Sequence, residues 1–376
     1  MFKNEEEMQQ WLEKKLESNS LLELIDNFED FNEGKNYKNI ESQHLHKSFE
    51  YCLENLGVTD VVFANKNISK EKGEGLKPDL ILYSEETEAL IVIELKNIKG
   101  PTRQAGTELI AYNCELRTYF PLLSNNDLIY IIVSNDWPTL LKHYIYHDVV
   151  WSNKKILCLE PFDKKGEICL RIIDLDNFIR VGSIEEISKI SAYQLCLYES
   201  PKFKEDHEII VPLMKASLLE MAKYGNSIQA HGFSFLWKDS NYPDMSYAPY
   251  SITVFNSSTF SSLSFLEDID QNSFEFKLYS KVQKSIGFGN AIFDITKAGR
   301  SFIESFTHAD IEGLFNFKVH WQIICSRAHP KISFSAWGIY GEKYKQFYLE
   351  KIREDLFYEY DDPELAVSFL ESIFDI

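Results

Sequence analysis

The sequence predicts an α/β fold in its first half, a mixed sheet flanked by helices, followed by a second domain of the α+β class. Three observations support this prediction. Short apolar strands alternate with amphipathic helices between about residues 41 and 175. Beyond this segment, aromatic and serine-rich strand-like pieces lie between longer helical stretches. The chain has 376 residues, against roughly 150 residues for a typical domain, so we expect more than one core.

Changes in composition divide the chain into an N-terminal helical extension, an α/β domain and a C-terminal α+β domain of unknown role. We expect these parts to span residues 1–40, 41–180 and 185–376, respectively. Apolar residues at helical spacing, among them Met8, Leu12 and Leu16, predict helices in the extension.

Within the α/β domain, hydrophobic periodicity and helix-ending residues predict the elements in order. A helix is expected to run from about Glu41 to Leu56, because Gly57 stands where helix C-termini favour glycine. Pro101 favours the start of a second helix that runs to Tyr119. Short apolar runs predict strands at 58–64, 78–83, 89–96, 128–133, 156–159 and 168–173.

Composition and charge exclude several classes of protein. Hydrophobic residues make up 44% of the chain, which indicates a folded protein rather than a disordered one. No segment approaches the ~18 uninterrupted apolar residues of a membrane span, so we expect no membrane partner. Six scattered cysteines without a C-x-x-C pair are typical of free thiols in the cytoplasm. The formal net charge of -19 argues against coating nucleic acid by long-range attraction, but it leaves a local cationic groove open.

The most informative segment is a pair of apolar strands bounded by charged residues. Pro78-Asp79 leads into the first strand, and Glu94-Leu95-Lys96 ends the second. Because side chains alternate along a strand, Glu94 and Lys96 share one face and Leu95 points to the other. A hairpin would bring the Asp79 and Glu94 carboxylates together, and hard divalent ions prefer such oxygen ligands. A plain salt bridge between Asp79 and Lys96 is the alternative, although it leaves the burial of Glu94 without a structural benefit.

These residues resemble the motif of the PD-(D/E)xK nucleases, a family with a restriction-endonuclease-like mixed sheet flanked by helices. The resemblance covers roughly residues 41–135 and includes the order of the elements. It implies that Asp79, Glu94 and the Leu95 backbone ligate Mg²⁺ or Mn²⁺. It also implies that Asp79, Glu94 and Lys96 are catalytic, with the lysine positioning or activating the attacking water. Burial that lowers the lysine pKa would increase its neutral fraction.

The same resemblance points to two further residues, Glu41 and Gln104. Many family members add a metal-binding carboxylate from the preceding helix, and Glu41 lies about 60° from the centre of that helix's apolar stripe, closer than Glu50 or Glu54. Gln104 matches a catalytic glutamine that contacts the scissile phosphate or the water. The alternatives are an acid favoured by the helix dipole for Glu41 and an ordinary surface residue for Gln104.

Other polar groups give weaker signals. Glu108 and Tyr112, one and two turns beyond Gln104, are candidates for supporting contacts. His143 and His147 have a spacing that zinc ligands use on a helix, but no third ligand is evident, so we interpret them as ordinary histidines. The aromatic stretch at 231–260 is expected to be core and loop of the second domain rather than a base-stacking surface.

Together these features predict a nuclease that uses Mg²⁺ or Mn²⁺ to hydrolyse phosphodiester bonds, with DNA as the favoured nucleic-acid partner. Fusion to an unfamiliar second domain suggests bacterial restriction or anti-phage defence, and a homo-oligomer or a regulatory protein partner. Two alternatives stay open. The chain is a catalytically inactive binding or scaffold protein with a nuclease fold, or a nuclease held silent until its C-terminal domain binds a partner or ligand.

Overall fold

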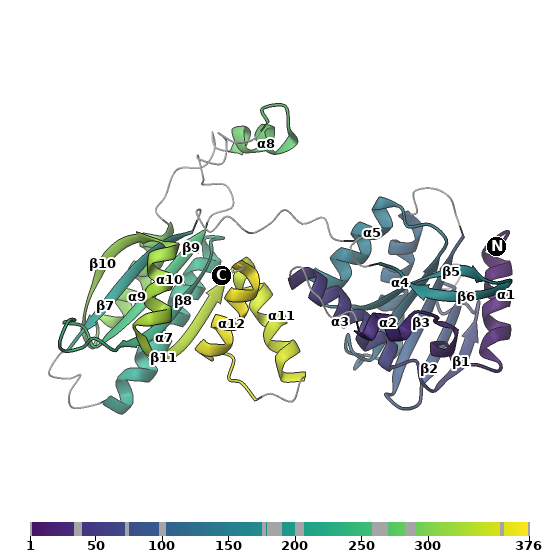
Figure 1. The fold of residues 1–376 in the computed structure, drawn as a ribbon, viewed down its shortest axis with the longest axis horizontal. Helices are drawn as coiled ribbons and strands as arrows, with labels where there is room; N and C mark the ends of the chain where they lie inside the picture. The colour runs from purple at the N-terminus through teal and green to yellow at the C-terminus, as the bar shows by residue number, and fades with distance from the viewer. Residues whose placement is uncertain are drawn as a thin grey trace. The chain divides into compact units, whose positions relative to one another are not determined.

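The computed structural model describes residues 2–33, 40–71, 75–97, 103–174, 178, 190–199, 207–257, 270–282, 291–353 and 357–374. The chain divides into two compact units, Met1–Gly182 and Ser183–Ile376 (Figure 1). The division falls in the segment where the composition of the sequence changes. Within the described residues, no helix combines the length and the apolar character needed to cross a lipid bilayer.

Unit 1 is built on one six-stranded sheet with the strands in sequence order. The strands are β1 (Thr59–Ala64), β2 (Leu80–Ser84), β3 (Ala89–Lys96), β4 (Leu128–Ser134), β5 (Lys155–Lys164) and β6 (Glu167–Ile172). Strands β1 to β3 form an antiparallel meander, β3 to β5 are parallel, and β6 returns antiparallel to β5. The sheet is therefore mixed, as the sequence predicts.

Helices flank this sheet, which confirms the predicted α/β class (Figure 1). They are α1 (Glu5–Leu16), the short η1 (Leu22–Leu24), α2 (Phe28–Glu33), α3 (Ile40–Glu54), α4 (Arg103–Tyr119), α5 (Thr139–Tyr146) and the π-helical η2 (His147–Trp151). Helices α1 and α4 pack against β3, and α4 also packs against α5. All seven residues of β4 are buried, because this strand lies in the interior of the sheet.

The helices of the N-terminal extension belong to the core of unit 1. Met8 and Leu12 of α1 and Leu21 before η1 are fully buried in the same hydrophobic cluster as the strands. The amphipathic pattern that predicts these helices therefore also explains what they cover. As a result, α1 is close enough to β3 to contribute side chains at the end of that strand.

Helix α3 is fixed to the sheet at the part of β5 that β6 leaves uncovered. The pairing of β6 with β5 begins at Leu159, so the first residues of β5 need other hydrogen-bond partners. The Ser48 hydroxyl of α3 accepts from the Ile156 N–H at 3.0 Å and donates to the Ile156 carbonyl at 3.2 Å. A side chain thus replaces a strand at this edge.

Gly106 allows α4 and α5 to approach closely. A Cβ at this position would lie 2.8 Å from Cδ2 of the Tyr144 ring, closer than real Cβ contacts. We expect Gly106→Ala to lower the free energy of unfolding of unit 1 by about 1–3 kcal/mol, because overpacking forces the ring or the backbone to move. Urea denaturation of the full chain measures this change.

Gly75→Ala is the matched control for this substitution. A Cβ at Gly75 would meet no atom within 4 Å, so its effect should stay within about 0.5 kcal/mol. Equal denaturation midpoints for the two alanine variants would contradict the proposed close contact between α4 and α5.

Unit 2 contains a five-stranded antiparallel sheet in the order β10-β7-β9-β8-β11. The strands are β7 (Ser191–Tyr198), β8 (His231–Asp239), β9 (Tyr250–Ser257), β10 (His308–Asn316) and β11 (Ala328–Trp337). The helices are α7 (His207–Ser227), α8 (Phe274–Val282), α9 (Ala291–Ile303), α10 (Phe317–Ser326), α11 (Ile339–Arg353) and α12 (Pro363–Phe374). Helices and an antiparallel sheet give this unit an α+β composition.

Most of the rings in the strands of the aromatic stretch at 231–260 belong to the core of unit 2, whereas Tyr247, between the strands, is exposed. Phe233 is fully buried and its ring stacks on Phe255 with a centroid distance of 4.8 Å. Trp237 is also fully buried, and its indole N–H donates to Oγ1 of Thr253 at 2.9 Å. Buried rings with satisfied polar atoms stabilise a core and are not available to stack on a nucleic acid.

Candidate active site

The hairpin formed by β2 and β3 brings Asp79 and Glu94 together. Leu80 of β2 pairs with Ile93 of β3. Because the two strands are antiparallel, continuing this register by one residue places Asp79 opposite Glu94. Oδ2 of Asp79 accepts a hydrogen bond of 2.7 Å from the Leu95 N–H. The Asp79 carboxylate is therefore held directly at the end of β3.

Glu94 and Lys96 share one face of β3, as strand alternation predicts. Nζ of Lys96 lies 2.5 Å from Oε1 of Glu94 and 2.9 Å from Oε2 of Glu108, which α4 contributes. The side chains of Lys96 and Glu94 are only 6% and 4% exposed. Leu95 points to the opposite face and is fully buried in the hydrophobic core. The sheet and α4 thus enclose a cluster of charged groups, defined here as Asp79, Glu94, Lys96 and Glu108.

Burial shifts the pKa values of the two acids in this cluster upward. It raises the pKa of Asp79 to about 6, although the Leu95 N–H and the Lys96 charge oppose the shift. Burial likewise raises the pKa of Glu94 to about 9, with Lys96 opposing it and Asp79 adding to it. Ionising these two carboxylates in the folded chain is therefore unfavourable without a further positive charge.

The pKa of Lys96 is shifted upward, away from neutrality. Burial alone would lower the pKa of its ammonium, but the charge and hydrogen bond of Glu94, reinforced by Glu108, outweigh burial and raise it. The net shift does not support the expectation that burial increases the neutral fraction of this lysine. The direction of this shift favours the protonated form of Lys96.

One carboxylate oxygen of the cluster lacks a hydrogen-bond donor among the described residues. Oε2 of Glu94 is buried and has no hydrogen-bond partner among the described residues. Next to it, the Tyr112 hydroxyl donates to the Lys77 carbonyl at 3.1 Å. Burial raises the Tyr112 pKa, and the charge of Glu94 and the close approach of its carboxylate add to the shift. A buried carboxylate oxygen without a donor carries a free-energy cost that a bound cation would remove.

Helix α1 contributes two side chains that the sequence analysis missed. Nε2 of Gln9 donates to the Asp79 carbonyl at 3.4 Å. Oε1 of Glu5 accepts from the Asn97 N–H at 3.3 Å, and the charge of Glu5 contributes to the raised pKa of Asp79. In the sequence, Glu5 reads as one of three acids that favour a helix N-terminus, so no local signal distinguishes it.

The other predicted site residues are Glu41, Leu95 and Gln104, and the structure places each of them differently. Glu41 is buried in α3, and its charge acts on the Tyr146 hydroxyl of α5. Among the residues the structure describes, no three His, Cys, Asp or Glu side chains converge in metal-ligand geometry, so the expected carboxylate set with Glu41 is not assembled. The Leu95 N–H donates to Asp79, and the role of the Leu95 carbonyl as a metal ligand stays a prediction. Gln104 belongs to α4, but its side chain lies outside the described part of the structure.

The groups present fit a magnesium-type ion better than a structural metal such as zinc. Mg²⁺ is held in proteins by one or two carboxylates together with waters and substrate phosphates. Asp79 and the unpartnered Oε2 of Glu94 provide two carboxylates at one strand end.

Comparison with protein-family models, with curated proteins and with solved structures finds no match.

Glu108 is expected to act on the chemistry through Lys96. Its carboxylate helps to fix the ammonium, so we predict that Glu108→Gln lowers any metal-dependent activity measured at this site by about 10-fold, within the 10–100-fold that supporting contacts of metal sites typically contribute. Glu115→Gln is the matched control, because Glu115 lies on the same helix and accepts from the Lys70 N–H instead. Equal activity of both variants would contradict this role.

Proposed function

We propose that unit 1 is a metal-dependent nuclease that hydrolyses phosphodiester bonds, with DNA as the favoured substrate. The observation that carries the proposal is the convergence of Asp79 and the unpartnered Oε2 of Glu94 beside the buried cation Lys96. Raised pKa values for both acids are typical of functional sites.

The order of elements from α3 to β4 supports a more specific assignment. A helix precedes three antiparallel strands, and a second helix leads to a fourth strand parallel to the third. This order, together with Asp79 and Glu94-Leu95-Lys96 at the ends of the second and third strands, agrees with the restriction-endonuclease-like arrangement that the motif implies. We therefore assign the unit, as a proposal, to the PD-(D/E)xK nucleases.

Each residue of the cluster has a role in this reaction. Asp79 and Glu94 would hold the Mg²⁺ or Mn²⁺ ion, which when bound makes a water more acidic and stabilises the charge on the phosphoryl oxygens. The upward direction of the Lys96 pKa shift supports a charged ammonium that would neutralise charge on the scissile phosphate rather than remove a proton from the water. Glu94 and Glu108 keep the ammonium in place.

The test is an incubation of the full chain with supercoiled plasmid, linear duplex DNA, single-stranded DNA and RNA. We expect cleavage in Mg²⁺ or Mn²⁺ and none in EDTA. A chain that binds Mn²⁺ in calorimetric titration but cuts none of these substrates would overturn the proposal in favour of a binding protein that keeps the fold.

A further inference from the structure

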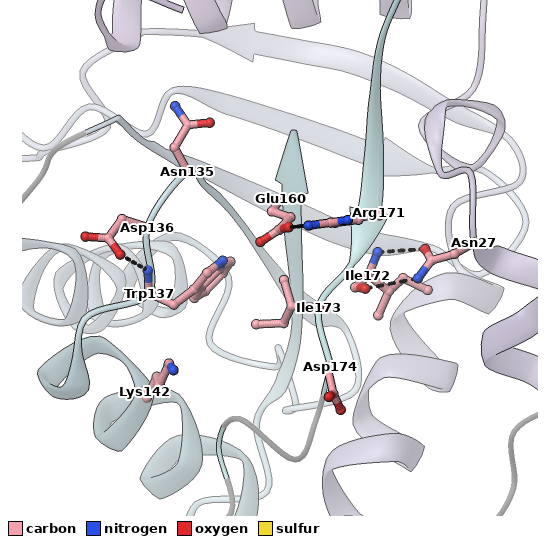
Figure 2. Close-up of a pocket in the computed structure, with 10 residues that line it drawn as sticks. All are labelled: Asn27, Asn135, Asp136, Trp137, Lys142, Glu160, Arg171, Ile172, Ile173 and Asp174. Atoms are coloured by element: carbon pink, nitrogen blue, oxygen red, sulfur yellow. Dashed lines mark hydrogen bonds and ion pairs between the residues drawn. The ribbon is translucent and has the colours of Figure 1, made fainter. Parts of the chain in front are cut away.

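A pocket of about 580 Å³ lies in unit 1, outside the cluster of charged groups (Figure 2). The connection from β4 to α5 forms one wall, and β5 and β6 form the other. Its main polar and aromatic lining residues are Asn135, Asp136, Trp137, Lys142, Glu160 and Arg171. Ligands of open α/β sheets bind outside the carboxyl ends of the parallel strands. This pocket lies beyond the carboxyl end of β4 and beside the middle of β5, where the pairing of β5 with β4 ends.

The pocket adjoins the candidate active site. The Asn135 N–H donates to the Lys96 carbonyl at 3.3 Å. Lys96 pairs with Ser134, and continuing the β4–β5 register places Glu160 next in the same row. These three side chains therefore share one face of the sheet. Two strand spacings of about 4.8 Å put Glu160 roughly 10 Å from Lys96, about three steps of a stacked nucleic-acid strand at 3.4 Å each.

The charges in the pocket do not favour a phosphate group. Three acids, Asp136, Glu160 and Asp174, line it together with two cations, Lys142 and Arg171. The Arg171 guanidinium is already paired with the Glu160 carboxylate (Figure 2). An anion would meet net repulsion, whereas a neutral group with both donors and acceptors would not.

The lining residues instead suit a nucleic-acid base. Trp137 is half-buried and rests edge-on against Phe178, with 6.1 Å between ring centroids. The nitrogen-bearing edge of its ring faces the side of the pocket on which Glu160 lies (Figure 2), and this nitrogen has no hydrogen-bond partner among the described residues. Aromatic rings stack on unpaired bases, while carboxylates, carboxamides and guanidinium groups pair with base edges.

We propose that this pocket receives one unpaired base of the substrate strand, a few nucleotides from the scissile phosphate. The inference rests on the nuclease function proposed above and specifies its substrate. A base inside a duplex must be unstacked and unpaired before it can enter such a pocket. Single strands, frayed ends and loops are therefore preferred to intact duplex.

Binding of fluorescein-labelled 12-nucleotide single-stranded DNA tests the proposal. The full chain is titrated in Ca²⁺, which occupies oxygen-ligand sites, and gels verify that the DNA stays intact. A set of oligonucleotides carries one abasic site at each position in turn. We expect one position at which removal of the base weakens affinity about tenfold, the size of one lost stacking interaction. In Trp137→Leu that position should lose its effect.

Trp151→Leu is the matched control, because Trp151 is a partly exposed tryptophan before the opposite end of β5. It should keep the sensitive position. If Trp137→Leu does not fold, Glu160→Gln replaces it, and the expected change is the order of preference among the four bases at that position.

The outcomes separate the two proposals. Wild-type protein without any base-sensitive position, or a folded Trp137→Leu variant that keeps it, overturns the pocket assignment while metal-dependent cleavage stands. Failure of the wild type to bind single strands while it cuts duplex also overturns the pocket assignment. Absence of cleavage on every substrate overturns the nuclease function itself.

Discussion

Replacing Glu94 by glutamine is expected to lower the rate of metal-dependent DNA cleavage by more than about a hundredfold. Loss of a direct ligand should exceed the 10–100-fold that changes in its supporting contacts typically cost. The change is nearly isosteric, so it removes the charge of the carboxylate and keeps its shape in the buried site. Initial rates of plasmid nicking in saturating Mn²⁺ measure the effect.

Asp79→Asn and Lys96→Met should produce losses of similar size, because each removes one charge from the same cluster. Glu85→Gln is the matched control. It removes an exposed carboxylate from the turn of the same hairpin and should leave the rate unchanged. Cleavage by Glu94→Gln at the wild-type rate would remove the assignment of the site.

The second prediction concerns how the free energy of unfolding of the metal-free protein depends on pH. The Glu94 pKa is raised from its ordinary value of 4.5 to about 9 in the folded chain, so the folded state binds this proton more tightly than the unfolded state. The stability contributed by Glu94 is then fully present below pH 4.5 and is lost as the pH rises towards 9. The Asp79 pKa, raised to about 6, has the same sign over a lower range.

Glu94→Gln should therefore stabilise the metal-free protein at pH 8 by about 2 kcal/mol or more, since each pKa unit corresponds to about 1.4 kcal/mol. For a unit of this size, that is a rise of about 4–8 °C in Tm. At pH 4 the two proteins should unfold alike. Thermal unfolding monitored by circular dichroism at both pH values makes the measurement.

Bound Mn²⁺ should reverse the difference in stability between the wild type and the Glu94→Gln variant at pH 8. Mn²⁺ binds the ionised carboxylates and displaces their protons, so its effect on the wild-type Tm should grow between pH 6 and pH 9. The Glu94→Gln variant should show little stabilisation by Mn²⁺. A wild-type protein that is more stable than the variant at pH 8 in EDTA would contradict the buried, unfavourably ionised carboxylate.

The sequence predicts the central part of the site because that part is local. Asp79 and Glu94 lie in one hairpin, where strand alternation and register decide which side chains meet. The contributions of Glu5 and Gln9 could not be predicted, since they depend on how α1 packs against β3. The pocket at Trp137 is likewise assembled from segments far apart in the chain.

The sequence predicts where strands lie better than where they end. The β5–β6 hairpin is longer than the apolar runs at 156–159 and 168–173 suggest. Lys165 and Gly166 both have positive φ, 57° and 92°, and such a two-residue turn allows pairing to continue up to Lys164 and Glu167. Polar residues beside a tight turn thus belong to the ladder, which hydrophobic patterning alone does not detect.

All members of the charged cluster come from a short stretch of unit 1, between Asp79 and Glu108, and the whole of this unit precedes unit 2 in the chain. Domains generally fold as units during synthesis, the N-terminal one first. A chain still on the ribosome would therefore assemble the charged cluster before the second unit had been translated. Any restraint that unit 2 imposes on the proposed DNA cutting would begin only after unit 2 has been synthesised.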